Sequence, residues 1–303
     1  MRTLWLFVVG ILPGLTACSP QPAADERLQV ILIPADGGTE DGTKGDYQPI
    51  FSAVSRMTGY DFELRAGQAY AGVVEAMCNG SADIAFVGPV TYLQARERGC
   101  AELLAVAVEK GQSIYYSGLF TKADSPIREL ADLKGKRVAF GDVNSTSSFV
   151  FPMTMIMEAG IDPARDLGAI RMTASHVDSL AALVQGQADV AALSFDSYGK
   201  AVGQGAVDPA TIRVVARSIP IPYPPLIMST RLPQDTKAKL REAFGRVHQA
   251  EGVKPEMIRG YGGKQVDRYD SAFPAERFDL AAVKMAELDE ARISSIVAKA
   301  SEQ

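Results

Sequence analysis

Apolar runs at two places along the chain predict the same succession of strands and helices. Each begins with an apolar strand, continues through a polar or glycine-rich loop into a helical pattern, and returns in a second short strand. The segments are residues 30–33, 47–58 and 61–64 in the first copy and residues 137–140, 147–159 and 169–172 in the second.

The repeat is clearest where the next helix ends. Residues 76–85 and 182–191 match at an offset of 106, and in each a helix ends at glycine and turns through Ala-Asp into a β-branched strand. Each copy therefore predicts an α/β lobe with a mostly parallel sheet flanked by helices. A period this long indicates two duplicated lobes and not a solenoid.

We expect the chain to cross between the lobes twice. A strand at residues 114–121 leaves the first lobe, and the chain returns around residues 214–228 through four prolines in six residues. Proline restricts its own φ and the preceding residue, which predicts a stiff, extended connection. Helices at about 233–251 and 278–300 are expected to pack on the first lobe. The prediction is lobe 1 at 28–118 plus 224–303 and lobe 2 at 119–223, joined by two extended hinge strands, with a ligand cleft between them.

The amino-terminal segment has the pattern of an exported lipoprotein. Apolar residues run from Leu4 to Leu12, too short to span a bilayer but suited to a signal-peptide core. Leu-Thr-Ala-Cys then ends at Cys18 and resembles a lipobox, with an ordinary signal peptide as the alternative. We predict a signal peptide at 1–17, a lipidated terminus and tether at 18–27, and a location on the periplasmic side of a bacterial membrane.

Composition narrows the classes of function. The 303 residues include 47% hydrophobic and 22% charged residues, which is ordinary for a globular protein. The net charge is −5 and no basic block occurs, which argues against nucleic acid as a partner. Two histidines and three cysteines have no metal-ligand spacing, so we expect neither metal nor cofactor. For Cys78 and Cys100, a disulfide and two buried thiols agree equally well with the sequence.

The segment 141–148, Gly-Asp-Val-Asn-Ser-Thr-Ser-Ser, is the best candidate for chemistry. It lies between a predicted strand and a predicted helix, where its hydroxyls can meet the unpaired amides of the helix start. Capping a helix needs only one hydroxyl. The additional hydroxyls of this segment favour an anion-binding site that needs no Lys or Arg side chain. The repeat pairs Tyr70 with His176, and Asp196 ends an apolar strand nearby. A helix-start histidine and a capping aspartate are the structural alternatives for His176 and Asp196.

Several motifs occur in the order of a known family. They are Ile33-Pro34, residues 70–76, residues 83–89 with Tyr92, Gly141-Asp142 with residues 145–147, and Ser175-His176. Over about residues 28–230 the chain resembles the phosphate/phosphite/phosphonate-binding components of ABC importers. The resemblance implies a type II periplasmic-binding-protein fold, binding without catalysis, and a permease as partner. Carried over position by position, the ligand-binding residues are Tyr70, Tyr115, Ser145, Thr146, Ser147, His176 and Asp196.

We therefore expect a monomeric, lipid-anchored solute-binding protein for phosphite, phosphate or an alkylphosphonate. A carboxylate only accepts hydrogen bonds, so Asp196 would select ligands that keep a P–OH and would face a dianion as an unscreened like charge. In aminophosphonate-binding relatives a second acid stands near the position of Tyr223, so Tyr223 would disfavour ligands with an amine.

Two other functions are compatible with these residues. A lipoprotein that delivers an oxyanion signal to a sensor kinase would share every cleft residue, and only its docking partner would differ. An exported hydrolase could use Ser145, His176 and Asp196 as a triad, but the chain lacks the G-x-S-x-G turn around the serine.

Overall fold

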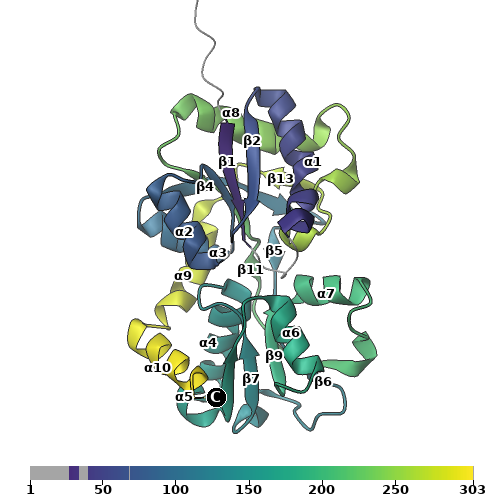
Figure 1. The fold of residues 1–303 in the computed structure, drawn as a ribbon, viewed down its shortest axis with the longest axis vertical. Helices are drawn as coiled ribbons and strands as arrows, with labels where there is room; N and C mark the ends of the chain where they lie inside the picture. The colour runs from purple at the N-terminus through teal and green to yellow at the C-terminus, as the bar shows by residue number, and fades with distance from the viewer. Residues whose placement is uncertain (1–26, 34–39, 68, 303) are drawn as a thin grey trace, which may run out of the picture.

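The computed structural model describes residues 27–33, 40–67 and 69–302, which form two α/β lobes joined by a narrow waist (Figure 1). The predicted signal peptide and the lipidation site Cys18 lie outside the described residues. Within the described part, lobe 1 has a six-stranded sheet and lobe 2 a five-stranded sheet. No helix in these residues combines the length and apolar character needed to cross a bilayer.

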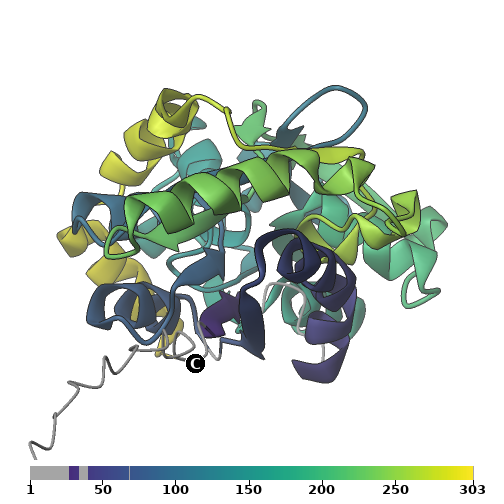
Figure 2. The same ribbon diagram turned by 90° about the horizontal axis from the view of Figure 1, so that it is seen from above.

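The sheet of lobe 1 combines two separate parts of the chain. Strand β12 (Pro225–Ser229), from the returning segment, lies between β3 (Ile84–Phe86) and β4 (Ala101–Val108) and is antiparallel to both. The full order is β13 (Arg268–Asp270), β4, β12, β3, β1 (Arg27–Leu32) and β2 (Asp61–Ala66), with β1 parallel to its two neighbours. The helices of lobe 1 are α1 (Glu40–Thr58), α2 (Tyr70–Asn79), α3 (Pro89–Glu97) and α8 (Gln234–Arg246), of which α8 lies across the lobe in Figure 2.

Lobe 2 is formed by one continuous stretch of chain apart from a C-terminal helix described below. Its strand order is β10 (Ile212–Arg217), β6 (Ser117–Lys122), β9 (Val190–Ser194), β7 (Arg137–Phe140) and β8 (Ala169–Met172). Its helices are α4 (Phe151–Glu158), α5 (Pro163–Asp166), α6 (His176–Val184) and α7 (Phe195–Gly203). Every residue of β9 is buried, as expected for a strand covered on both faces.

The structure keeps the internal repeat. Strands β3, β1 and β2 lie in the same order as β9, β7 and β8, and in each triplet the first strand also pairs with an antiparallel strand, β12 or β6. Helices α2 and α6 begin 106 residues apart, at Tyr70 and His176, and so do α3 and α7. Both sheets are mixed, because each parallel set is completed by antiparallel pairing with a strand next to a crossing between the lobes. In lobe 1 this strand is β12, and in lobe 2 it is β6.

The hinge consists of two short antiparallel strands, β5 (Ile114–Tyr115) and β11 (Ile221–Pro222), between the lobes (Figure 1). The single predicted strand at 114–121 is divided into β5 and β6, so the chain turns from hinge to lobe 2 at Tyr116. Proline has no amide proton to donate. It suits this position because β11 pairs with a strand on one side only, so not every amide of β11 has to donate a hydrogen bond.

The C-terminal helices differ from expectation. Helix α9 (Asp279–Ala286) lies beside α3 of lobe 1, but α10 (Glu290–Ala300) lies against β8 and α5 of lobe 2 (Figure 1). The assignment of all of residues 224–303 to lobe 1 is therefore wrong for α10. The amphipathic pattern identified a helix with a buried face, and Ile296 is fully buried, but the pattern carries no information on which lobe covers it.

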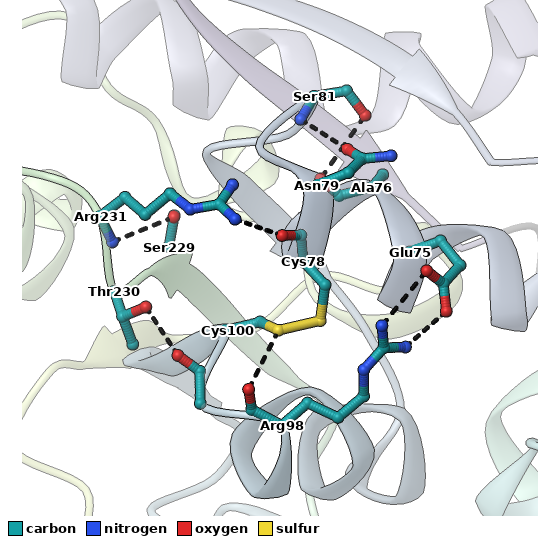
Figure 3. Close-up of a disulfide and its surroundings, with 11 residues drawn as sticks. Glu75, Ala76, Cys78, Asn79, Ser81, Arg98, Cys100, Ser229, Thr230 and Arg231 are labelled. Atoms are coloured by element: carbon teal, nitrogen blue, oxygen red, sulfur yellow. Dashed lines mark hydrogen bonds and ion pairs between the residues drawn. A yellow bond between two sulfur atoms is a disulfide. The ribbon is translucent and has the colours of Figure 1, made fainter.

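The two cysteines that the sequence left open form a disulfide. Cys78 lies in the last turn of α2, Cys100 directly precedes β4, and their Cα atoms are 4.8 Å apart (Figure 3). The guanidinium of Arg231 donates to the carbonyl of Cys78, and Arg98 pairs with Glu75 beside the bridge. The disulfide thus fixes the end of α2 to the start of an inner strand of lobe 1.

We expect the paired substitution Cys78→Ala and Cys100→Ala to lower the free energy of unfolding by about 3 kcal/mol, from the entropy of a loop closed across 22 residues. Urea denaturation would measure the loss. Reductant should destabilise the wild type to a similar degree and leave the double variant unchanged. An equal response of both proteins to reductant would show that the bridge does not form.

Candidate functional site

The predicted site residues lie at the edges of the two sheets that face one another. In lobe 2, the hydroxyl loop follows β7, His176 begins α6 after β8, and Asp196 lies at the start of α7 after β9. In lobe 1, Tyr70 begins α2 after β2, and Tyr115 lies in the hinge strand β5. Parallel strands place their following loops at one edge, so the sheet order brings these residues to the cleft.

The hydroxyl loop enters its helix through an unusual wide turn. Residues Thr146–Val150 form a π-helical turn, in which the amide of Val150 donates to the carbonyl of Ser145 at 3.0 Å. Pro152, in the first turn of α4, has no amide to donate to the carbonyl of Ser147. The hydroxyl of Ser117 donates to that carbonyl instead, at 2.7 Å. The turn thus accommodates the proline and holds the loop against β6.

The three predicted hydroxyl residues have different partners. Ser145 is the N-cap, and its hydroxyl accepts hydrogen bonds from the amide and the hydroxyl of Ser148, at 3.2 and 2.7 Å. The hydroxyl of Thr146 accepts the amide of Val90, at the start of α3 in lobe 1, at 2.9 Å. Ser147 and Thr146 are hydrogen-bonded to the phenol of Tyr115. One hydroxyl therefore caps the helix, and two take part in contacts across the cleft.

Tyr115 is a neutral hydrogen-bonding group. Burial raises the pKa of its phenol far above the usual value, and the hydrogen bonds with Ser147 and Thr146 offset only part of that rise. At physiological pH the phenol thus keeps its proton and can donate to an anion.

The tautomer of His176 follows from one contact. The backbone amide of Ser194 donates to Nδ1 of the buried imidazole at 3.0 Å, so Nδ1 carries no proton. The remaining proton of the neutral ring is then on Nε2, which lies 2.9 Å from the hydroxyl of Tyr261. His176 therefore presents a neutral N–H donor to the cleft, fixed in orientation by the end of β9.

Tyr261 is a site residue that the motifs did not identify. Its ring lies between Tyr115 and His176, with ring centroids 5.7 and 6.1 Å away, and its amide donates to the hydroxyl of Tyr223 at 3.1 Å. It belongs to lobe 1, in the loop that leads to β13. Adjacent glycines at 262 and 263 were the available signal, because they mark a sharp turn between an aromatic residue and a lysine.

Asp196 is not the isolated carboxylate expected from the sequence. Its carboxylate pairs with the ammonium of Lys264 at 2.8 Å, and Lys264 also pairs with Glu109 at 2.7 Å. The expectation that a dianion would meet Asp196 as an unscreened like charge is therefore wrong. Asp196 does not cap α7 either, since the hydroxyl of Ser194 accepts the capping amide. Sequence separation hid Lys264, which is 68 residues away.

The site opens into two cavities on either side of the Tyr261 turn. One, of about 820 Å³, is lined by Tyr115, Asp196, Lys264 and Tyr261, and the other, of about 360 Å³, also includes Tyr261. Of the predicted site residues, Tyr115 and Asp196 line the larger cavity, whereas the hydroxyl loop, His176 and the buried Tyr70 line neither of the two. The space for a small ligand thus lies on the side of Tyr115, Asp196 and Tyr261, next to the buried donors of the hydroxyl loop.

The same geometry argues against hydrolysis by Ser145, His176 and Asp196. In such a triad a carboxylate orients Nδ1, and an unprotonated Nε2 removes the serine proton. Here Nδ1 accepts the amide of Ser194, Nε2 carries the proton, and Asp196 pairs with Lys264. Among the described residues, no group of three or more His, Cys, Asp or Glu side chains is placed to hold a metal ion.

Comparisons with known proteins concern the family and the fold of the chain. A family model described as "ABC transporter, phosphonate, periplasmic substrate-binding protein" matches residues 38–272. The chain is 29% identical over 243 residues to the phosphate-import protein PhnD of Mycolicibacterium smegmatis, covering 76% of this chain and 75% of that protein. It is 26% identical over 234 residues to the phosphonates-binding periplasmic protein of Escherichia coli, covering 76% and 69%.

A solved structure shares the fold. The binding-protein component of an ABC phosphonate transporter from Pseudomonas aeruginosa matches with a TM-score of 0.74 and 21% identity, covering 92% of this chain and 96% of that one. The two-lobed type II periplasmic-binding-protein fold expected from the sequence is thereby confirmed.

We expect ¹⁵N NMR to show His176 as the neutral tautomer protonated at Nε2 throughout pH 6–8, because the Ser194 amide occupies Nδ1. The chain has only two histidines, so His248→Asn would assign the signals. A charged imidazolium, or a proton on Nδ1, would contradict the assignment of His176 as a fixed neutral donor.

Proposed function

Because this chain belongs to the family of phosphonate-binding periplasmic substrate-binding proteins of ABC transporters, we propose that it captures phosphite, phosphate or an alkylphosphonate between its lobes. The observation that carries the proposal is the set of neutral donors at the cleft. The phenol of Tyr115, the hydroxyls of Thr146 and Ser147, and Nε2–H of His176 are all buried. Buried donors suit an oxyanion whose several oxygens accept hydrogen bonds once water is excluded.

Contacts between the lobes couple this binding to closure. Thr146 accepts an amide from lobe 1, Gln94 of α3 donates to Asn144 at 2.8 Å, and Tyr261 of lobe 1 meets His176. Each contact exists only when the lobes are together, so a ligand that binds the same groups favours the closed state by its difference in affinity for the two states. A permease that recognises the closed form would receive loaded protein.

One wall of the cleft offers no negative charge to a ligand that carries an amine. Tyr223, at the return hinge, is buried, and its ring packs edge-on against Tyr115 at 6.0 Å. Burial raises the pKa of its phenol, so the residue offers an ammonium no negative charge. The names of the relatives, a phosphate-import protein and a phosphonates-binding protein, support the same ligand class.

We further propose that Cys18 carries the lipid that anchors the protein, as a monomer, near an inner-membrane permease. Several acyl chains on one terminus give durable anchoring, at about 0.8 kcal/mol per buried methylene.

We expect Ser147→Ala to weaken the binding of methylphosphonate about ten- to a hundredfold, because a hydrogen bond to a charged group contributes about 1.5–3 kcal/mol. Calorimetry would measure the affinity for methylphosphonate, phosphite, phosphate, aminoethylphosphonate and sulfate. Ser148→Ala is the matched control, because its hydroxyl faces Ser145 within the same turn. Equal affinities for the two variants would remove the loop from the site, and absence of binding to every phosphorus oxyanion would refute the proposed function.

We expect Cys18→Ala to release the exported protein from membranes, since the thiol is the proposed acylation point. Fractionation after a carbonate wash would measure the partition, and methylphosphonate binding by the released protein would show that the fold is intact. A variant that stays in the membrane pellet would exclude lipidation at Cys18.

A further inference from the structure

The turn that carries Tyr261 and Lys264 into the cleft is held in place by lobe 1. Gly262 and Gly263 have φ values of 65° and 73°, in the left-handed region that favours glycine. A Cβ on Gly263 would be strained by this φ and would displace the carboxylate of Asp46, so glycine suits the position. The hydroxyl of Tyr47 also donates to the carbonyl of Gly260 at 2.6 Å. Lys264 therefore starts from a fixed backbone position.

Lys264 connects two acids that come from different parts of the fold. Asp196 belongs to lobe 2 and is only 10% exposed, whereas Glu109 follows β4 in lobe 1. Burial lowers the pKa of the Lys264 ammonium, but its hydrogen bonds with the two carboxylates raise it by more, so Lys264 stays charged. The three side chains together carry a charge of −1, with Lys264 in contact with both acids.

The charge of this group acts on the proposed ligand site. Asp196, Lys264, Tyr115 and Tyr261 line the same cavity, and the negative charge of Asp196 contributes to the raised pKa of the Tyr115 phenol. Tyr115 in turn is hydrogen-bonded to Ser147. A change of charge at this group would thus be felt where the oxyanion is proposed to bind.

We propose that Lys264 is a specificity-determining residue. By offsetting the negative charge of Asp196 and Glu109 beside the site, it allows dianionic as well as monoanionic ligands to bind. This inference rests on the proposed function. Without Lys264 the two acids would present a charge of −2, and a dianion would be repelled more strongly than a monoanion. Neutralising Glu109 would act in the opposite direction, because Lys264 would then balance Asp196 alone.

The other charged groups at the cavity stay constant in this comparison. His176 is neutral, as argued above. The remaining charged residues that line the cavity are Asp46, Lys110, Lys200 and Arg217, of which Lys200 and Asp46 lie 3.9 Å apart.

The pH dependence of affinity distinguishes binding of the monoanionic ligand from binding of the dianionic ligand. Phosphate monoesters have a second pKa of about 6, and methylphosphonate, which lacks the electron-withdrawing ester oxygen, keeps its second proton to a higher pH. It passes from monoanion to dianion between about pH 6 and pH 9. Calorimetry with methylphosphonate across this range would give the affinities of wild type, Lys264→Met and Glu109→Gln, with the ligand titrated alone to fix its charge. Lys239→Gln, on α8, is the matched control, because it removes one positive charge outside the two cleft cavities.

We expect Lys264→Met, relative to wild type, to lose on the order of tenfold more affinity at pH 9 than at pH 6. Glu109→Gln should change the ratio of the affinities at the two pH values severalfold in the opposite direction. This variant remains informative if Lys264→Met folds poorly. Lys264→Arg should restore the wild-type profile, and Lys239→Gln should keep it.

A loss of affinity in Lys264→Met by the same factor at every pH would overturn this inference and leave the proposed function standing. A Glu109→Gln profile that matches the wild type would overturn it as well. Absence of methylphosphonate binding by the wild type at every pH, in contrast, would refute the proposed function together with the inference.

Discussion

Lobe 1 cannot complete its sheet until the chain has returned from lobe 2. Strand β12 lies inside that sheet, between β3 and β4, yet it follows all of the lobe 2 strands in the sequence. The two crossings must therefore lie side by side, and they pair as β5 and β11. This pairing places Tyr115 in the hinge and Tyr223 directly after it, so their rings meet behind the proposed site. The hinge thus connects the two lobes and also forms one wall of the cleft.

The proposed anion site relies on neutral hydrogen-bond donors that the fold holds in place. The loop after β7 would ordinarily begin a regular helix, but Pro152 removes an amide and the first turn widens into a π-helical turn. The widening leaves hydroxyls of the loop available to Tyr115 and to the start of α3. At the ends of the neighbouring strands, the amide of Ser194 sets the tautomer of His176. Neutral donors held by backbone can bind an oxyanion with little reorganisation, because their positions do not depend on the ligand.

Closure involves more of the chain than the two hinge strands. Helix α9 is held to lobe 1 by the pair of Arg96 and Asp279, at 3.4 Å, and to lobe 2 by the pair of Lys284 and Glu158. Helix α10 then lies on lobe 2, so the chain crosses between the lobes a third time. On the cleft side, Tyr261 and Lys264 extend from lobe 1 to His176 and Asp196. Movement of the lobes must therefore break or rearrange contacts on both sides of the hinge.

Local patterns determined most of the fold and part of the site. The repeat at an offset of 106 depends on strand and helix periodicity and on glycine stops, which are properties of neighbouring residues. It predicted that helices end near Gly80 and Gly186, as α2 and α6 do. The hydroxyl loop and His176 could be identified because they follow strands, and the order of parallel strands decides which loops share an edge. The lobe that α10 covers, the bridge between Cys78 and Cys100, and the ion pair of Asp196 with Lys264 were decided only by the tertiary structure. Each depends on a distance between residues far apart in the chain, and hydrophobic periodicity contains no information on such distances.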